Sequence, residues 1–102
     1  MQARQGDIYF EAISEIPADA KKVEARGRYI IAEGEATGHH HSVAAMPDVE
    51  MFERDGTLYL RVAREDVKVE HQEHAPIDLP VGVYRVGRQR EYHPEAIRQV
   101  AD

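Results

Sequence analysis

The sequence contains no cysteine and no tryptophan, and it has no long run of apolar residues. Without cysteine, the chain can form no disulfide and offers neither a thiolate metal ligand nor a cysteine nucleophile. No apolar run approaches the roughly 20 residues that a membrane-spanning helix needs, and the first residues lead into no apolar segment typical of a secretory signal. These absences predict a cytoplasmic protein that does not associate with membranes.

Positive charge is scarce relative to negative charge. The chain has 13 Lys and Arg residues against 19 Asp and Glu residues, which gives a formal net charge of −6. This balance disfavours a protein that coats nucleic acid, because such binding depends on neutralising many phosphates. A length of 102 residues is typical of one domain. We therefore expect a single β-rich domain over residues 1–102 and no nucleic-acid partner.

Alternation of apolar and polar residues between turn residues is the dominant pattern, and it predicts strands. The expected strands are residues 7–13, 28–33, 37–46, 49–54, 57–63, 67–71 and 83–92, with a polar connection at 17–22 and an extended segment at 76–80. After Pro94, the residues Ile97, Val100 and Ala101 fall on one side of a short helix. The expected fold is all-β and mostly antiparallel, a small barrel or sandwich of about seven strands with a short C-terminal helix.

The clearest local signal is a hairpin between Val49 and Ala63. Its centre is Asp55-Gly56, which suits a two-residue type I′ turn because both positions need positive φ. Counting outward from this turn pairs six residues on each side, with one face apolar and the other carrying an aromatic pair and an opposite-charge pair. The apolar face holds Val49, Met51, Leu60 and Val62, and the other face holds Phe52 opposite Tyr59 and Glu50 opposite Arg61.

Histidine is abundant, and five of the six histidines fall in two clusters. On an extended strand His39 and His41 share a face with Cα atoms about 6.5–7 Å apart, while His40 points the other way. That spacing lets two imidazoles meet one ion at metal–nitrogen distances of roughly 2.0–2.1 Å. In the second cluster, a bend after His71 would bring its ring beside that of His74. We expect His39, His41, His71 and His74 to hold a metal ion.

Acidic residues surround the second histidine cluster. Glu73 and Glu70 are expected to hold ligand histidines through their second ring nitrogen, or to add a ligand. Because the chain offers nitrogen and oxygen donors but no thiolate, a divalent Zn, Fe, Ni or Mn ion would each suit the site. The alternative interpretation is that these histidines are solvated hydrogen-bonding groups on the surface.

The last predicted strand is locally basic. Arg88, Arg90 and Tyr92 form a candidate interaction segment, since arginine can contact phosphate and tyrosine can stack on a base. The alternative is that these alternating arginines form the solvated face of a strand and pair with the acidic stretch that contains Glu70 and Glu73.

Two resemblances follow from these motifs. The segment Gly38-His39-His40-His41 is similar to the metal-binding strand of cupins, and Leu79-Pro80-Val81-Gly82 is similar to the cupin P-x-G turn. This likeness implies a cupin-like metal-dependent enzyme, although it covers under a fifth of the chain. The sequence also departs from the cupin pattern, because no Glu follows the histidine pair closely and the later histidines precede Pro80.

The second resemblance covers most of the chain. The motifs Gly-His-x-His, Asp-Gly-Thr-Leu-Tyr-Leu-Arg-Val, His-x-Glu-His-x-Pro-Ile-x-Leu-Pro-x-Gly-x-Tyr and Arg-Gln-Arg-Glu-Tyr-x-Pro-Glu resemble a group of small uncharacterised bacterial and phage-borne proteins. The group carries no known activity. The resemblance implies a bacterial cytoplasmic or mobile-element setting, and it makes His40 the least expected ligand of its run.

The preferred functional hypothesis is a small histidine-rich metal-binding β module of unknown physiological role. A non-enzymatic role is favoured, because no acid–base pair or substrate-binding signature accompanies the histidines, and no catalytic residue is predicted. The rival hypothesis is a homo-oligomeric assembly or interaction protein of phage or mobile-element origin that needs no metal. Such a protein would self-associate through its sheet edges and weaken as histidines charge below about pH 6.5.

Overall fold

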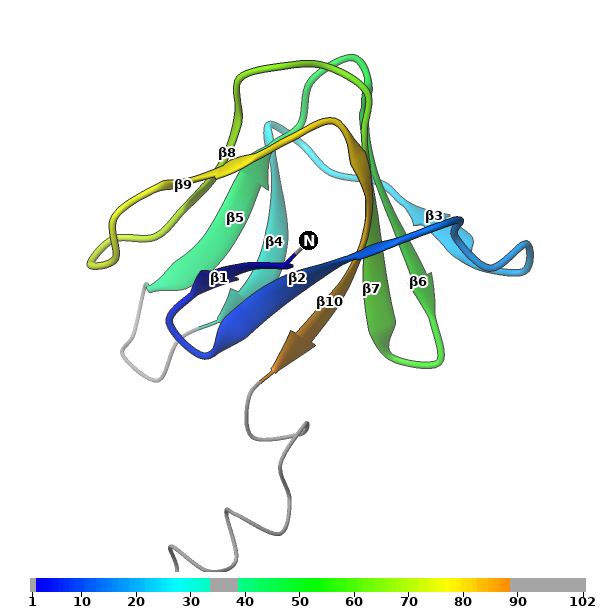
Figure 1. The fold of residues 1–102 in the computed structure, drawn as a ribbon, viewed down its shortest axis with the longest axis horizontal. Helices are drawn as coiled ribbons and strands as arrows, with labels where there is room; N and C mark the ends of the chain where they lie inside the picture. Colours follow the sequence, from blue (N-terminus) through cyan, green and yellow to red (C-terminus); the bar gives the residue numbers. More distant parts are fainter. Residues whose placement is uncertain (1, 34–38, 89–102) are drawn as a thin grey trace, which may run out of the picture.

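The structure, a computed structural model, describes residues 2–33 and 39–88, which form two antiparallel β-sheets (Figure 1). The larger sheet has the strand order β1-β2-β10-β7-β6-β3, and the smaller has the order β4-β5-β8-β9. The strands are β1 (Gln2–Gln5), β2 (Ile8–Ile13), β3 (Lys21–Val23), β4 (Arg28–Glu33), β5 (His40–Ala44), β6 (Val49–Arg54), β7 (Thr57–Val62), β8 (Val67–Glu70), β9 (Ile77–Leu79) and β10 (Gly82–Arg88).

The all-β, mostly antiparallel prediction is confirmed for the described residues, but the barrel alternative is wrong. β1 lies beside β9 at the junction of the sheets, yet among the described residues its only ladder is with β2, and no ladder joins β3 to β4. The sheets therefore stay separate. The described chain has ten strands where about seven were expected. The prediction missed β1, and it assigned part of β3 to a polar connection, because strands of 4 and 3 residues are too short to show a period.

Three predicted features lie wholly or partly outside the residues that the structure describes. They are the helix expected after Pro94, the end of the last predicted strand at residues 89–92, and the start of the strand predicted over residues 37–46, at residues 37 and 38. Within the described part of the chain, no helix has the length and apolar character of a bilayer span.

The predicted hairpin is confirmed as β6–β7. Its six residue pairs have the expected register, and Asp55 and Gly56 have φ values of 51° and 82°. On the outer face of the larger sheet, Arg61 Nη1 donates a hydrogen bond to Glu50 Oε1 at 2.9 Å. The guanidinium of Arg61 also lies 5.1 Å from the centre of the Phe52 ring. Turn chemistry and cross-strand pairs therefore agree on one register.

One hydrophobic core fills the space between the sheets. Its members come from strands of both sheets, and Phe10, Val43 and Leu60 are completely inaccessible to solvent. Each such side chain stabilises the fold by about 1.5–3 kcal/mol relative to an exposed position. The hydroxyl of Tyr84, also in this core, donates to the Pro80 carbonyl at 2.6 Å and so remains satisfied away from water. Packing around this core holds the two sheets against each other, and so places the β1–β2 end of the larger sheet beside the histidines of the smaller one.

Candidate metal centre

The pairing of β5 with β8 brings the two histidine clusters together. Ser42 lies opposite Glu70 and Val43 opposite Val69 in this antiparallel ladder. One further step along both strands sets His41 against His71 on the inner side, where Val43 and Val69 also point. Beyond the end of the ladder, His39 Nδ1 lies 3.2 Å from Glu73 Oε1. Contacts between the two segments therefore extend past the ladder, into the bend that follows His71.

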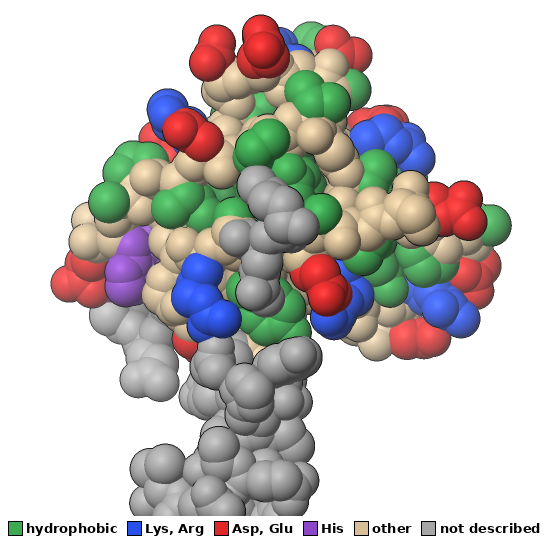
Figure 2. Space-filling view, in the orientation of Figure 1, with side chains coloured by type: hydrophobic (Ala, Val, Ile, Leu, Met, Phe, Trp, Pro, Cys, Tyr) green, Lys and Arg blue, Asp and Glu red, His purple; other side chains and the backbone are tan. Residues whose placement is uncertain are grey.

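The four rings of His39, His41, His71 and His74, here called the histidine cluster, lie close together. The ring centre of His71 is 4.5 Å from that of His41, 4.7 Å from that of His74 and 5.7 Å from that of His39. The rings of His41 and His74 are 5.9 Å apart. Figure 2 shows histidine surface (purple) reaching solvent beside acidic and apolar side chains at the left of the molecule.

His39 differs from the prediction in its local structure. The sequence predicted His39 and His41 on one strand, but β5 begins at His40, so His39 directly precedes the strand. Its ring nevertheless lies beside that of His71. His71 and His74 lie in the connection between β8 and β9, where the chain bends as the sequence predicted. All four predicted ligands are therefore neighbours, although only His41 belongs to a strand.

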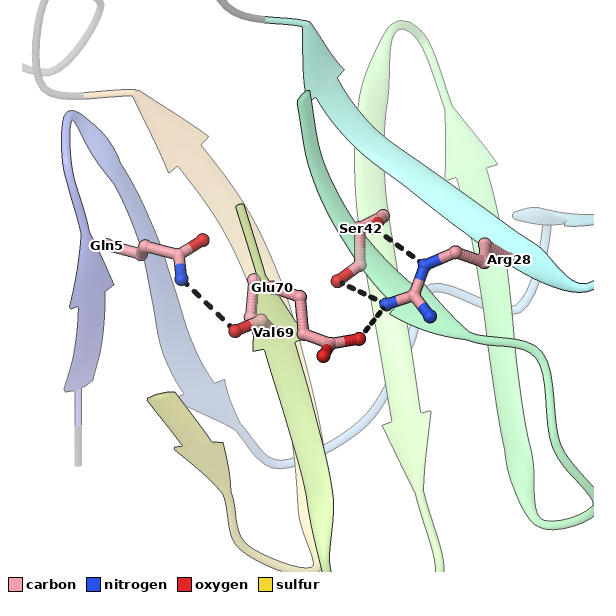
Figure 3. Close-up of polar contacts among 5 residues, drawn as sticks. All are labelled: Gln5, Arg28, Ser42, Val69 and Glu70. Carbon is pink, nitrogen blue, oxygen red and sulfur yellow. Dashed lines mark hydrogen bonds and ion pairs between the residues drawn. The ribbon is translucent and has the colours of Figure 1, made fainter. Parts of the chain in front are cut away.

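Gln5, at the end of β1, is a part of the site that the sequence did not indicate. Its side chain is 3% exposed, and its Nε2 donates to the carbonyl oxygens of Val69 at 3.1 Å and Ala75 at 2.9 Å. Figure 3 shows the first of these bonds, which ties β1 to β8. Its Oε1 lies 2.8 Å from His41 Nδ1. One amide therefore connects β1, β5, β8 and the connection that carries His71 and His74.

These contacts determine which nitrogen of His41 carries a proton. Carbonyl oxygens only accept hydrogen bonds, so the group that faces two of them must be the NH₂ of Gln5. Oε1 of Gln5 must then accept a hydrogen bond, and His41 Nδ1–H is the donor. In the neutral imidazole this leaves a lone pair on Nε2. An outer hydrogen bond of this kind commonly orients a metal-binding histidine.

The other rings are engaged differently. His71 Nδ1 accepts hydrogen bonds from the backbone N–H groups of Glu73 at 3.0 Å and His74 at 3.3 Å, so its proton lies on Nε2 when the ring is neutral. His74 packs against Gly6, the turn residue between β1 and β2. A Cβ atom at Gly6 would lie 2.9 Å from His74 Nε2, and Gly6 has a φ of 61°. Gly6 therefore suits this position both by its conformation and by its lack of a side chain.

Burial, and repulsion between neighbouring histidine rings in their charged form, keep the rings of His41 and His71 neutral. Burial is the main cause that lowers the pKa of His41 from 6.5 to about 4, and the neighbouring His71 and His74 lower it further. The carboxylate of Asp7 acts in the opposite direction, and Arg88 adds to the lowering. The pKa of His71 is also lowered, first by burial and then by His74 and His39. Neutral imidazoles are the form that binds metal ions.

The cluster is not arranged as a finished coordination sphere. Within residues 2–33 and 39–88, no group of three or more His, Asp or Glu side chains already has the geometry to hold a metal ion. Two nitrogens face other partners, because His71 Nδ1 accepts from its own turn and His39 Nδ1 faces Glu73. Coordination by several of these rings would require them to rotate about their side-chain bonds.

The outer side of the same strands has a different polar network. The backbone N–H of His40 donates to Gln72 Oε1 at 2.8 Å, and His40 lines a shallow hollow on this side with Arg28 and Glu70. Arg28 Nε donates to Ser42 Oγ at 2.8 Å, and its Nη2 bonds to the Glu70 carboxylate (Figure 3). The structure thus pairs Glu70 with Arg28, whereas Glu73 lies at the histidine cluster.

The predicted interaction segment is described only in part. Arg88 ends β10, opposite Ile8 of β2, and its side chain is half-buried. Arg90 and Tyr92 lie outside the described residues. In Figure 2, basic and acidic side chains are interspersed over the visible face, and no continuous basic surface is seen on it.

Comparison with known proteins places the chain in a family. Residues 4–89 match the family described as a domain of unknown function, DUF8820, and the chain belongs to that family. The matched range contains all four members of the histidine cluster and Gln5. Neither the curated proteins nor the solved structures gave a match.

Proposed function

We propose that the protein is a small metal-binding β module, in which the histidine cluster holds one divalent transition-metal ion. The observation that carries this proposal is the convergence of four imidazoles from two distant segments, with the buried ring of His41 oriented by Gln5. Rings bound to one tetrahedral ion at roughly 2.0–2.1 Å through a nitrogen have centres about 5 Å apart. The separations of the His71 ring from the other three rings, and of the His41 ring from that of His74, range from 4.5 to 5.9 Å and bracket that spacing.

The donor set indicates the role of each ring. His41 would bind through Nε2, because Nδ1 donates to Gln5. His71 and His74 would join it after a rotation of their partly exposed rings, and His39, held near Glu73, would supply a fourth nitrogen. Nitrogen donors without thiolate suit Zn, Ni, Fe or Mn, so the residues specify the class of ion and not the element.

The proposed role is structural and non-enzymatic. Gln5 and the histidine cluster join β1, β5 and the β8–β9 connection, which are far apart along the chain. An ion at this point would cross-link them in a domain that has no disulfide. The resemblance to small bacterial and phage-borne proteins supports a bacterial or mobile-element setting for such a module.

Elemental analysis of tag-free protein tests the proposal. We expect about one equivalent of metal per chain in the wild-type protein, or on titration with Zn²⁺ or Ni²⁺, and loss of that metal in His41→Ala and His71→Ala. His40→Ala is the matched control, because His40 lies in the same histidine run but on the outer side of β5. A wild-type protein that takes up no metal, or a His40→Ala variant that loses it equally, would contradict the proposal.

A further inference from the structure

The edge strands of the two described sheets differ in how well they are protected against pairing with another chain. β1 and β9 lie beside each other at the junction of the sheets. β9 has only 3 residues and lies between Pro76 and Pro80, and β3 has 3 residues and begins with Lys21-Lys22. Short strands, proline and lysine are devices by which natural proteins prevent edge-to-edge association. Within residues 2–33 and 39–88, these devices leave β4 as the open edge.

The hydrogen bonds of β4 show which of its main-chain groups face away from β5. The N–H of Ala45 donates to the carbonyl of Gly27 at 2.8 Å, directly before the β4–β5 ladder. Hydrogen-bonded and non-bonded pairs alternate in an antiparallel ladder, so the main chain of Tyr29 bonds to β5, whereas the N–H and C=O groups of Arg28 and Ile30 point to the free edge. No other strand of the described chain pairs with β4 on that side.

The side chains at this edge have an apolar centre. Ile30 is 43% exposed, and the other large apolar side chain exposed among the described residues is Val81, in the β9–β10 connection. Arg28 lies on the same outer side as Ile30, and its guanidinium is held by Ser42 and Glu70 of the same sheet. An exposed isoleucine in an unpaired edge strand is a feature that pairing with a further strand would cover.

This edge is complementary to a second copy of itself. About a twofold axis at Tyr29, antiparallel pairing sets Arg28 of each chain opposite Ile30 of the other, and both residues have main-chain groups that face the edge. Each such pair exchanges two hydrogen bonds. An axis at Arg28 would set two like charges directly opposite, which is destabilising. An axis at Ile30 would set Arg28 against Ala32, beyond the bulge at Ile31 where the ladder is irregular.

We propose that β4 is a self-association site, at which the β4 strands of two copies pair antiparallel about Tyr29 and join the two smaller sheets into one. A twofold dimer is the commonest closed form of homo-oligomer. The bulge at Ile31 limits the regular pairing to the first half of the strand, so the dimer is weak and depends on concentration. This inference goes beyond the metal proposal and does not rest on it, because β4 contributes no ring to the histidine cluster.

Sedimentation velocity of the full chain, with a chelator present, tests the proposal. We expect the average mass to rise from that of one chain towards that of two between roughly 1 µM and 1 mM protein, the range of a weak complex. Ile30→Lys should weaken the dimer by at least about tenfold, because a charge at an open edge opposes pairing. Val81→Lys is the matched control, since it adds the same charge at the other exposed apolar side chain, and it should leave the dimer unchanged.

Amide hydrogen exchange of the wild-type protein identifies the strand without any substitution. The N–H groups of Arg28 and Ile30 should exchange about tenfold more slowly where most chains are paired, whereas that of Tyr29, bonded to β5 in either state, should not change. The mass of a single chain throughout the range would overturn the proposal, and so would equal losses in Ile30→Lys and Val81→Lys. Slow exchange of Arg28 and Ile30 at every concentration would assign the edge to a segment of the same chain and would also overturn it.

Discussion

Gln5 shows how one buried side chain can determine the state of a neighbouring ring. Both donors and the acceptor of its amide are bonded, and its partners lie 36, 64 and 70 residues away along the chain. The sequence indicated all four histidines because their types and spacing are typical of metal ligands. It could not indicate Gln5, because a glutamine acquires this role only through contacts that the tertiary fold creates.

Replacing Gln5 by Leu should be costly to both stability and metal affinity. The substitution leaves the Val69 and Ala75 carbonyls and His41 Nδ1 buried without their partner, and each such unsatisfied group costs about 1–3 kcal/mol. We expect a loss of at least about 2 kcal/mol in urea unfolding, and a 10–100-fold weaker metal affinity. Gln72→Leu, at an exposed position, should change the stability by less than about 1 kcal/mol. Equal losses in both variants would contradict the role of Gln5.

The lowered pKa of His41 predicts a pH-dependent stability for the metal-free protein. The folded state holds this pKa near 4, whereas the unfolded chain has the ordinary value of 6.5. Between pH 4 and pH 6.5 the unfolded state therefore binds more protons at His41 than the folded state does. The contribution of the neutral His41 ring to the free energy of unfolding is complete above about pH 6.5 and is lost as the pH falls towards 4. Its full size is on the order of 3 kcal/mol.

Urea unfolding at several pH values, with a chelator present, measures this effect. Because acidic groups also titrate at the lower end of the range, the informative quantity is the difference between the wild-type protein and His41→Gln. We expect the wild-type protein to lose more stability than the variant between pH 6.5 and 5. Parallel pH profiles for the two proteins would show that His41 does not carry the dependence.

Among the elements, the β6–β7 hairpin and the β5–β8 pair show what could and could not be predicted. The hairpin register follows from Asp55-Gly56 alone, since a two-residue turn determines every pair that follows it. The β5–β8 register joins strands separated by an entire hairpin, so no local signal determines it. The sequence therefore singled out the four histidines, whereas the ladder that brings their rings together came from the structure.

The hairpin turn gives a prediction that depends on backbone conformation alone. Gly56 has a φ of 82°, and an added Cβ would meet no atom within 4 Å. Any loss of stability in Gly56→Ala must therefore come from the backbone, and we expect about 1–2 kcal/mol in urea unfolding. Gly56→Asn should lose less, because asparagine tolerates this conformation better. A Gly56→Ala variant as stable as the wild-type protein would contradict the type I′ assignment.

At the scale of the whole molecule, one small core must stabilise both sheets. Leu60 of β7 is completely buried in this core, and it belongs to the sheet that does not contain His41. Leu60→Ala should reduce the free energy of unfolding by about 2–5 kcal/mol, through lost burial and the cavity left behind. Domains of this kind have only about 5–15 kcal/mol of stability in total, so the variant should be marginal.

Metal binding should restore part of that loss, because an ion that binds only the folded state stabilises the entire cooperative unit. At a free metal concentration 100 times the Kd, the gain is about 2.7 kcal/mol, whatever the position of the destabilising change. Thermal unfolding of Leu60→Ala with and without Zn²⁺ or Ni²⁺ measures this rescue, and the wild-type protein should gain the same free energy. The double variant Leu60→Ala/His71→Ala should gain none. Equal rescue of the double variant would show that the ion acts elsewhere than at the histidine cluster. Leu60→Ala changes only the core, so His71→Ala is the one change in the double variant that affects a proposed metal ligand.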